Sequence, residues 1–308
     1  MELIKPGTKI DFVSKMKWAA ILSFICILAT FILGLTKKLN YGIDFAGGIE
    51  IQIEFLKPVE IGRLRDALKP LNLGDVEVKR VGGEAFDRGY IIRTEMEEAG
   101  EKKDTVALLT SSLGERFGGY DENKLYTSLV GPRAGAEMRK KGFQAVFFSL
   151  VFLLIYIAVR FDLLFAIGGI LALFHDVVIT MGAIILTGRE FNLTTIAALL
   201  TIVGYSINDT IVIYDRIREN SKKFRLKPFR DLVNASTNET LSRTILTSLT
   251  VLFTVSVFFI MGRGTIKDFA FALLVGMVSG VYSTVFIASA FVIFWKNYIG
   301  PRFTKKRA

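Results

Sequence analysis

The sequence predicts an α-helical membrane protein with six transmembrane helices and one α+β, ferredoxin-like extracytoplasmic domain inserted between helices 1 and 2. Three observations lead to this fold class. Hydrophobic residues make up 51 % of the 308 residues, more than a water-soluble protein of this length normally carries. The charged residues, 22 % of the chain, are nearly absent from several long stretches, as in alternating membrane and aqueous segments. The polar segment 36–142 instead has the strand and helix patterns of a folded domain.

Six apolar stretches are each long enough to cross about 30 Å of hydrocarbon at ~1.5 Å per residue. The first has a basic flank, Lys15 and Lys17, as a secretory signal would. It ends without a small-residue cleavage pattern, so we expect an uncleaved anchor. The predicted spans are 18–35, 143–159, 163–186, 193–214, 244–261 and 269–295.

The short loops predict that both termini are cytoplasmic, because cytoplasmic loops are rich in Lys and Arg. Segment 215–243 carries eight basic residues, whereas the opposite loops hold only Arg189, Arg263 and Lys267. The basic cluster at 139–141 lies on the other side, but it borders a long translocated domain, where the charge rule is weak. Basic residues also gather in both terminal segments: Lys5, Lys9, Lys15, Lys17, Lys296, Arg302, Lys305, Lys306 and Arg307.

These features divide the chain into four parts. Residues 1–35 form the cytoplasmic N-terminus and helix 1, 36–142 the periplasmic domain, 143–295 helices 2–6, and 296–308 a basic cytoplasmic tail. The net charge of +10 is that of membrane-anchoring loops, so we predict contact with membrane lipid and no nucleic-acid partner. The single cysteine, Cys26, excludes an internal disulfide and disfavours a thiolate metal site.

The segment 36–142 predicts the element order β-α-β-β-α-β of a ferredoxin-like domain. Apolar residues alternate with polar ones over 49–55 and 76–81, which indicates half-buried strands. Helical patterns follow at 61–71 and 101–117, and further strands at 90–94 and 125–130. A turn is expected at Gly82-Gly83.

A glycine-rich loop, 42–48, precedes the first of these strands. A phosphate-binding loop would need a following Lys-Ser/Thr and a helix N-terminus, and this loop leads into a strand without them. We therefore expect a tight backbone turn just above the membrane.

Asp209 is the strongest candidate for function inside the membrane. It lies about 24 Å along the fourth span from Leu193, toward the cytoplasmic half. A charged side chain near mid-bilayer costs at least ~2.5–3.5 kcal/mol, so it needs a partner, a hydrated cavity or a function. Small and polar residues share its helical stretch and face other helices or water rather than lipid: Thr195, Ala198, Tyr205, Ser206 and the adjacent Asn208.

A matching polar seam opens the fifth span. Arg243, Thr247, Thr250 and Thr254 recur at helical spacing and share one face. Arg243 is therefore the predicted neighbour of Asp209, and the pair is the predicted proton-transport site. A static ion pair, or an arginine that extends to the cytoplasmic surface, is the alternative.

His175 and Asp176 form a second polar pair, about 20 Å into the third span. A proton relay and simple hydrogen bonding between helices both remain open, and Thr180 shares the face of Asp176. No further ligand stands at metal-binding spacing, so we predict neither a metal nor a cofactor. In the sixth span, Gly276 and Gly280 predict close helix packing.

Several motifs together are recognisable across the chain. They are Gly42-Ile43-Asp44-Phe45-x-Gly47-Gly48, Val130-Gly131-Pro132, His175-Asp176, Gly204-Tyr205-Ser206-Ile207-Asn208-Asp209-Thr210-Ile211-Val212, Asp215-Arg216-Ile217-Arg218-Glu219-Asn220 and Leu241-Ser242-Arg243-Thr244. With them, essentially the whole chain resembles the SecF family. The resemblance implies one half of a resistance–nodulation–division type of transporter, which pairs with SecD, a six-span subunit with a larger outer domain.

The resemblance also implies a function. SecF and SecD draw on the proton-motive force to help pull exported polypeptides out of the SecYEG channel in the bacterial inner (plasma) membrane. The implied partners are SecD, SecYEG with its accessory subunits YajC and YidC, the SecA-driven export system, and unfolded exported polypeptides. By the same resemblance, Asp209 and Arg243 match the family's charged pair for proton transport. The expected coupling ion is H⁺, with Na⁺ as the alternative, and no enzymatic activity is expected.

Three other functions compete with this one. A small-molecule or lipid exporter of the same superfamily usually has two six-helix sets and two large outer domains, whereas this chain has a single helix set and a single small domain, residues 36–142. An intramembrane hydrolase would need two metal ligands or two carboxylates that face each other, which Asp176 and Asp209 could supply, but Thr180 and Tyr205 near them favour a hydrated proton path. A scaffold without ion flux is the third alternative.

Overall fold

The computed structural model describes residues 8–71, 76–81, 88–94 and 102–299. Six helices in these ranges are long and apolar enough to span a membrane, and each contains one predicted span. They are α1 (Met16–Lys37), α5 (Pro132–Arg160), α6 (Leu163–Thr187), α7 (Leu193–Lys223), α8 (Phe229–Met261) and a last span that begins with α9 (Thr265–Ser283). The last span continues through a π-helix (Thr284–Ala288), α10 (Ser289–Phe294) and a second π-helix (Trp295–Ile299).

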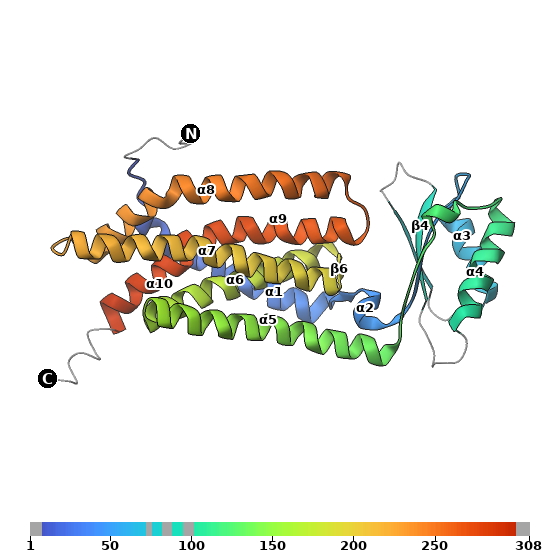
Figure 1. Ribbon diagram of the computed structural model, residues 1–308, viewed down its shortest axis with the longest axis horizontal. Helices are drawn as coiled ribbons and strands as arrows, with labels where there is room; N and C mark the ends of the chain where they lie inside the picture. Colours follow the sequence, from blue (N-terminus) through green and yellow to red (C-terminus); the bar gives the residue numbers. More distant parts are fainter. Residues whose placement is uncertain (1–7, 72–75, 82–87, 95–101, 300–308) are drawn as a thin grey trace.

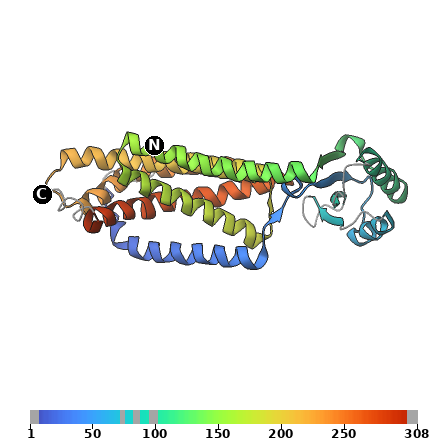
Figure 2. The same ribbon diagram turned by 90° about the horizontal axis from the view of Figure 1, so that it is seen from below.

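The bundle has an inner and an outer set of helices (Figures 1 and 2). In α7 and the last span 56 % of the most apolar stretch is buried, and in α6 44 %, against 11 % in α1, α5 and α8. The buried faces of α6, α7 and α9 carry small and hydroxyl residues, which let helices approach closely. The bundle centre therefore lies at the α6–α7–α9 contact.

Several helices extend beyond the predicted spans. α5 starts at Pro132, well before the expected boundary at 142, because proline at the first helical position fits a helix start. α7 and α8 likewise continue into the basic segment 215–243. α5, α7 and α8 are therefore each longer than the span predicted within them.

A second unit lies at one end of the bundle (Figure 1). Its elements are β2 (Gly48–Glu54), α3 (Ile61–Leu68), β3 (Val76–Arg80), β4 (Gly89–Thr94), α4 (Lys102–Phe117) and β5 (Tyr126–Val130). The strands form an antiparallel sheet in the order β3-β4-β2-β5. Because side chains alternate across a strand, Ile51 and Ile53 point together into a core with Leu64 and Leu113 of α3 and α4. The expected turn at Gly82-Gly83 lies outside the described residues.

Two short strands connect this unit to the bundle. β1 (Asn40–Tyr41) pairs in parallel with β6 (Glu190–Phe191), which joins α6 to α7. The glycine-rich loop follows β1 and contains α2 (Ile43–Ala46). Gly47 has φ +81°, and a Cβ there would lie 2.9 Å from Cα of Pro132. The loop is therefore a packed joint against the start of α5.

Candidate functional site

Asp209 lies on the inner part of α7 and is 9 % exposed. Ser248 of α8 donates a long hydrogen bond of 3.4 Å to its Oδ2. The carboxylate borders a cavity of about 110 Å³ between α7, α8 and α9, which has room for water. Polar or small residues form much of its lining: Tyr205, Ser206, Asn208, Thr247, Ser248, Gly276 and Gly280.

Arg243 lies on α8, one turn before Thr247, and its side chain is exposed. It attracts Asp209 through space, but in the part of the chain that the structure describes no ion pair joins the two side chains. Thr247 follows Arg243 by one helical turn and donates to its backbone oxygen at 3.0 Å, and its hydroxyl also helps to hold the charge of Asp209. The two charges are thus close enough to interact without being locked together.

Asp176 on α6 has very different surroundings. It is fully buried, and its Oδ2 accepts hydrogen bonds of 2.7 Å from both Ser206 of α7 and Ser283 of α9. Its Oδ1 accepts a 2.6 Å bond from Ser279 and lies 3.2 Å from Nδ1 of His175. The His175 ring stacks on Tyr282. One carboxylate therefore ties three helices together.

Ser206 connects the two acidic sites. It stands one turn before Asp209 on α7 and lines the Asp209 cavity while donating to Asp176. One turn beyond it, Thr210 lies 3.0 Å from the Thr284 hydroxyl, at the start of the first π-helix. π-helical turns are frequent at functional sites. The placement of Asp209 thus depends on contacts between α7 and the last span.

The predicted glycines lie at this same contact. A Cβ on Gly276 would overlap Ile202 of α7, and one on Gly280 would lie 3.2 Å from Cβ of Ser206. These glycines pack α9 onto α7 within the chain.

Tyr205 and Asn208 face outward, unlike Ser206. Tyr205 is 48 % exposed, and Asn208 is exposed as well. Arg243, Thr250 and Thr254 are exposed on the neighbouring α8. A polar face at membrane depth is costly against lipid, so this face, Tyr205/Asn208/Arg243/Thr250/Thr254, is suited to contact with protein.

A charged cluster joins the outer sheet to the bundle. The carboxylate of Glu190 in β6 forms ion pairs with Lys79 of β3, at 3.1 Å, and with Arg93 of β4. Arg93 also pairs with Glu50 of β2. The Arg93 and Glu190 side chains are only 12 % and 11 % exposed. Burial raises the pKa of Glu190, but the hydrogen bond and charge of Arg93 outweigh it, so the pKa lies below its usual value. Strand alternation was the sole sequence pattern at these residues, and it does not predict that they meet.

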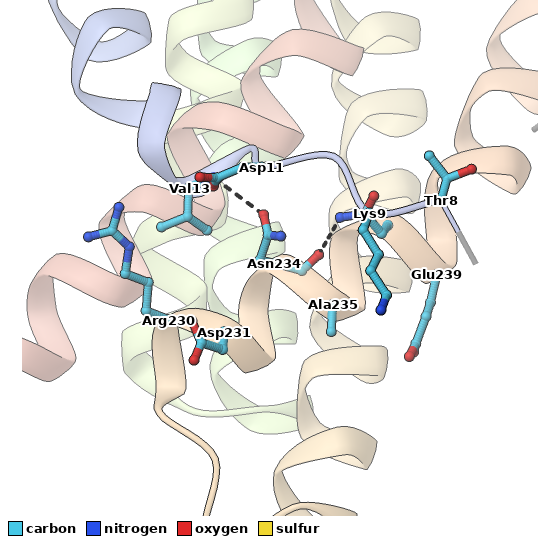
Figure 3. A pocket seen from close by; sticks show the side chains of 10 residues that line it. Thr8, Lys9, Asp11, Val13, Arg230, Asp231, Asn234, Ala235 and Glu239 are labelled. Carbon is cyan, nitrogen blue, oxygen red and sulfur yellow. Dashed lines mark hydrogen bonds between the residues drawn. The ribbon is translucent and has the colours of Figure 1, made fainter. Parts of the chain in front are cut away.

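The N-terminal segment forms another contact that sequence patterns missed (Figure 3). The Asn234 Oδ1 of α8 accepts from the backbone of Phe12 at 2.9 Å, and Asn238 both accepts from and donates to the backbone of Ile10. A cavity of about 560 Å³ lies beside this segment, lined by charged residues such as Lys9, Asp11 and Arg230. The N-terminal segment is therefore hydrogen-bonded to the part of α8 that precedes Arg243.

Comparison with known proteins identifies the class. The family model described as "Protein export membrane protein SecD/SecF, C-terminal" matches residues 111–298, and the "SecD/SecF GG Motif" matches 32–59. The second match includes the packed glycine loop, and the first includes α7, α8 and the acidic sites. The chain is thus a protein-export membrane protein of the SecD/SecF type.

Relatives that match almost the whole chain identify the family within this class. The protein translocase subunit SecF of Calditerrivibrio nitroreducens is 42 % identical over 307 residues, covering 96 % of this chain and 97 % of that protein. The SecF subunit of Desulfurispirillum indicum is 39 % identical, covering 96 % and 95 %. The chain belongs to the SecF family of protein translocase subunits.

Solved structures agree with this family. The crystal structure of SecDF from Thermus thermophilus, described as a translocon-associated membrane protein, matches with a TM-score of 0.84 and 35 % identity over 96 % of this chain. A second SecDF structure, in a super-membrane-facing form, matches with a TM-score of 0.71 and 36 % identity. The chain spans 40 % and 41 % of those two proteins.

Proposed function

We propose that this chain is a proton-driven auxiliary subunit of the Sec export translocase, in which Asp209 carries the proton. The observation that carries the proposal is the setting of Asp209: a buried carboxylate held loosely, by a long hydrogen bond from Ser248 and by the Thr247 hydroxyl, beside a cavity large enough for water. Such a group can gain and lose a proton at modest cost, because few fixed donors hold its charged form.

In this proposal, Arg243 decides in which conformation Asp209 is charged. It attracts Asp209 without a fixed ion pair, so a small movement of α8 toward α7 would stabilise the charged form. Movement away would favour the protonated form. A charge that crosses 100 mV of membrane potential gains about 2.3 kcal/mol, enough to bias a conformational cycle.

We further propose that the partner is a SecD-type subunit. Both solved relatives are SecDF proteins in which the equivalent of this chain is less than half of the whole. The outward polar face, Tyr205/Asn208/Arg243/Thr250/Thr254, supports a protein neighbour at membrane depth. SecYEG, YajC, YidC and the SecA-driven system remain partners implied by family resemblance.

The proposal also includes an orientation of the chain in the membrane. The charge bias of the loops supports both termini in the cytoplasm of a bacterial inner membrane. Residues 36–142 would then form the ferredoxin-like extracytoplasmic domain, and their strand order β3-β4-β2-β5 supports that fold. This domain would meet exported polypeptides outside the membrane and help release them.

The test is export of a model secreted protein into energised inverted membrane vesicles, with and without an uncoupler. Asp209→Asn keeps the size of the side chain but removes its titration, so the complex should assemble and the uncoupler-sensitive stimulation should disappear. Asp209→Glu should retain part of it, and Asp176→Asn should lose less than Asp209→Asn. Full stimulation in Asp209→Asn vesicles would exclude Asp209 as the proton carrier. Replacing Na⁺ by K⁺ in the same assay separates H⁺ from Na⁺ coupling.

A further inference from the structure

A groove of about 540 Å³ lies between α1, α6 and α9, within the range of about 300–1,000 Å³ for small-molecule sites. α1 (blue) and α5 (green) lie on opposite sides of the bundle (Figure 2), and the groove is on the α1 side. Its rim residues Leu22 and Val278 are 54 % and 60 % exposed, so it opens toward the membrane lipid. Further wall residues are aliphatic or aromatic: Ile179, Leu274, His175 and Tyr282.

His175 brings a polar atom to the middle of the membrane beside this groove. It is the thirteenth of the 25 residues of α6, and only 4 % of its surface is exposed. Its Nδ1 lies 3.2 Å from Oδ1 of Asp176 and 3.4 Å from the Ser279 hydroxyl. Among the described residues, no hydrogen bond reaches the other ring nitrogen, Nε2. A buried polar atom without a partner is costly, so a ligand that pairs with Nε2 would be stabilised there.

Other polar side chains of the groove are paired within the chain. Ser23 donates to the Tyr282 hydroxyl at 3.1 Å, and Tyr282 donates in turn to the backbone oxygen of Ala19 at 2.6 Å. Ser279 donates its hydroxyl hydrogen to a carboxylate of the bundle. The chain's single cysteine also lines the groove, but a thiol bonds weakly. Nε2 of His175 is therefore the strongest polar atom that the described groove residues leave for a ligand.

The neighbouring carboxylate determines whether Nε2 donates or accepts. Asp176 accepts hydrogen bonds from three serine hydroxyls, as an ionised carboxylate does, since it offers only acceptors. The ring hydrogen of a neutral His175 therefore lies on Nδ1, which faces this carboxylate. Nε2 then carries a lone pair, so a matching ligand must donate a hydrogen bond.

We propose that this groove binds an uncharged lipid with a free hydroxyl group on a long apolar body, and that the hydroxyl donates to Nε2 of His175. A phospholipid headgroup does not fit, because its charged phosphate stays at the interface, about 15 Å from the middle of the ~30 Å hydrocarbon layer. A hydroxyl costs far less at this depth and recovers that cost in the hydrogen bond. Diacylglycerols and reduced isoprenoid quinones both have this chemistry.

The test is photoaffinity labelling of the full chain, together with the partner subunit that it retains, in phosphatidylcholine nanodiscs. One probe is a hexadecanol that bears a diazirine, and the other is its methyl ether, which lacks only the donated hydrogen. Mass spectrometry locates the label. We expect the alcohol to label the groove residues about fivefold more than the ether does, as one net hydrogen bond predicts. Both probes should label the lipid-facing Phe152 of α5, which is 68 % exposed, equally.

Three variants separate recognition from space. His175→Phe keeps a flat ring beside Tyr282 but removes Nε2, so the alcohol and the ether should label the groove equally. Val278→Phe leaves Nε2 in place and fills the groove, so labelling there by both probes should fall about fivefold. Val257→Phe makes the same change at a lipid-facing residue of α8, 53 % exposed, and should alter neither probe. The exposed Val278 can be replaced without disturbing the core, so the test stands even if His175→Phe fails to fold.

The opposite results would overturn the proposal. Equal labelling of the unmodified chain by the alcohol and the ether would show that the groove holds hydrocarbon without recognition. A preference for the alcohol that persists in His175→Phe would place the recognising atom elsewhere. Absence of label in the groove would show that the partner covers it. None of these results bears on the proton-carrying role of Asp209.

Competition with unlabelled lipids distinguishes the two sources of the hydroxyl. A diacylglycerol or a decyl hydroquinone that displaces the labelled alcohol is the type of ligand the groove takes. Decyl benzoquinone has the same ring and tail as the hydroquinone but no hydroxyl, so it should displace nothing. Displacement by neither hydroxyl lipid, or equal displacement by the benzoquinone, would overturn the proposal.

Discussion

The two buried aspartates of the bundle differ in almost everything except residue type. Asp176 is fully enclosed and receives hydrogen bonds from Ser206, Ser279 and Ser283, with His175 beside it. Asp209 borders a cavity and is held by a long bond from Ser248 and by the Thr247 hydroxyl. The difference teaches that burial alone does not identify a titrating acid in a membrane. The number of fixed donors around the carboxylate separates a structural site from a mobile one.

The largest effect should follow from removing the enclosed carboxylate. Asp176→Leu leaves buried hydroxyl donors on α7 and α9 without their acceptor, which should lower the free energy of unfolding by about 2–4 kcal/mol. Thermal unfolding of the purified chain in detergent, followed by size-exclusion chromatography, measures it. Asp176→Asn keeps an acceptor oxygen and should cost only about 1 kcal/mol. A Leu variant as stable as the parent would show that the serine contacts do not hold the helices.

The next effect concerns the glycines that place α9 against α7. Gly276→Ala should lower the stability by about 1–3 kcal/mol, because its Cβ would overlap Ile202 and force the helices apart. Gly280→Ala should cost less, since its nearest neighbours are 3.2 and 3.3 Å away on one small side chain. Gly204→Ala is the control: nothing lies within 4 Å of a Cβ there. It should be neutral or stabilise the helix by about 0.5–1 kcal/mol. The same unfolding assay ranks all three.

A third effect concerns Glu190, the acid at the joint between the bundle and the outer unit. Unlike the two aspartates, Glu190 forms ion pairs with basic residues. The pKa of Glu190 is lowered, so its links to Arg93 and Lys79 contribute fully above the ordinary glutamate pKa of about 4.3. Their contribution is lost as the pH falls through the lower, folded pKa. Glu190→Gln should weaken the joint by roughly 1–2 kcal/mol at neutral pH and remove this pH dependence.

Spin-label distances between α4 and α5, with labels at Leu108 and Phe147, provide the readout. The parent should give a narrow distribution at pH 7 that broadens toward pH 3, and Glu190→Gln should be broad at both. Glu54→Gln is the control, because its partner Lys124 is half exposed and both lie within the outer unit. A narrow distribution for Glu190→Gln at pH 7 would show that the β1–β6 pairing alone holds the joint.

The sequence was most informative where a pattern is local. Long apolar runs predicted each of the six helices, and alternation over 49–55 marked a strand that the structure has at Gly48–Glu54. The glycine spacing at Gly276 and Gly280 marked a face that lies against α7. These features depend on residues within a few turns of one another, so one stretch of sequence contains the whole signal.

Contacts between distant segments gave no comparable signal. The β1–β6 ribbon pairs residues 40–41 with 190–191, and two-residue strands are too short for any periodicity. Ser279 and Ser283 look like ordinary small packing residues until the fold brings them to Asp176. Asn234 and Asn238 stand four residues apart on α8, and only the docked N-terminal segment explains them. Each of these contacts depends on how the whole chain folds, so no single stretch of sequence predicts it.

The smallest expected effect on stability is at Asp209, and it is the sharpest test of the comparison. Asp209→Asn removes a charge that a 3.4 Å bond from Ser248, the Thr247 hydroxyl and the unpaired attraction of Arg243 hold only loosely, so the unfolding free energy should change by less than about 0.5 kcal/mol. The asparagine amide can still accept from Ser248, and the cavity can hydrate it. The same substitution at Asp176 should lower the stability measurably, because an amide nitrogen would face hydroxyl donors. If both variants unfold alike, the two acids are equally structural, and a separate role for Asp209 would depend on the export assay alone. If Asp209→Asn is stable yet loses the proton-driven stimulation, its carboxylate serves transport rather than the fold.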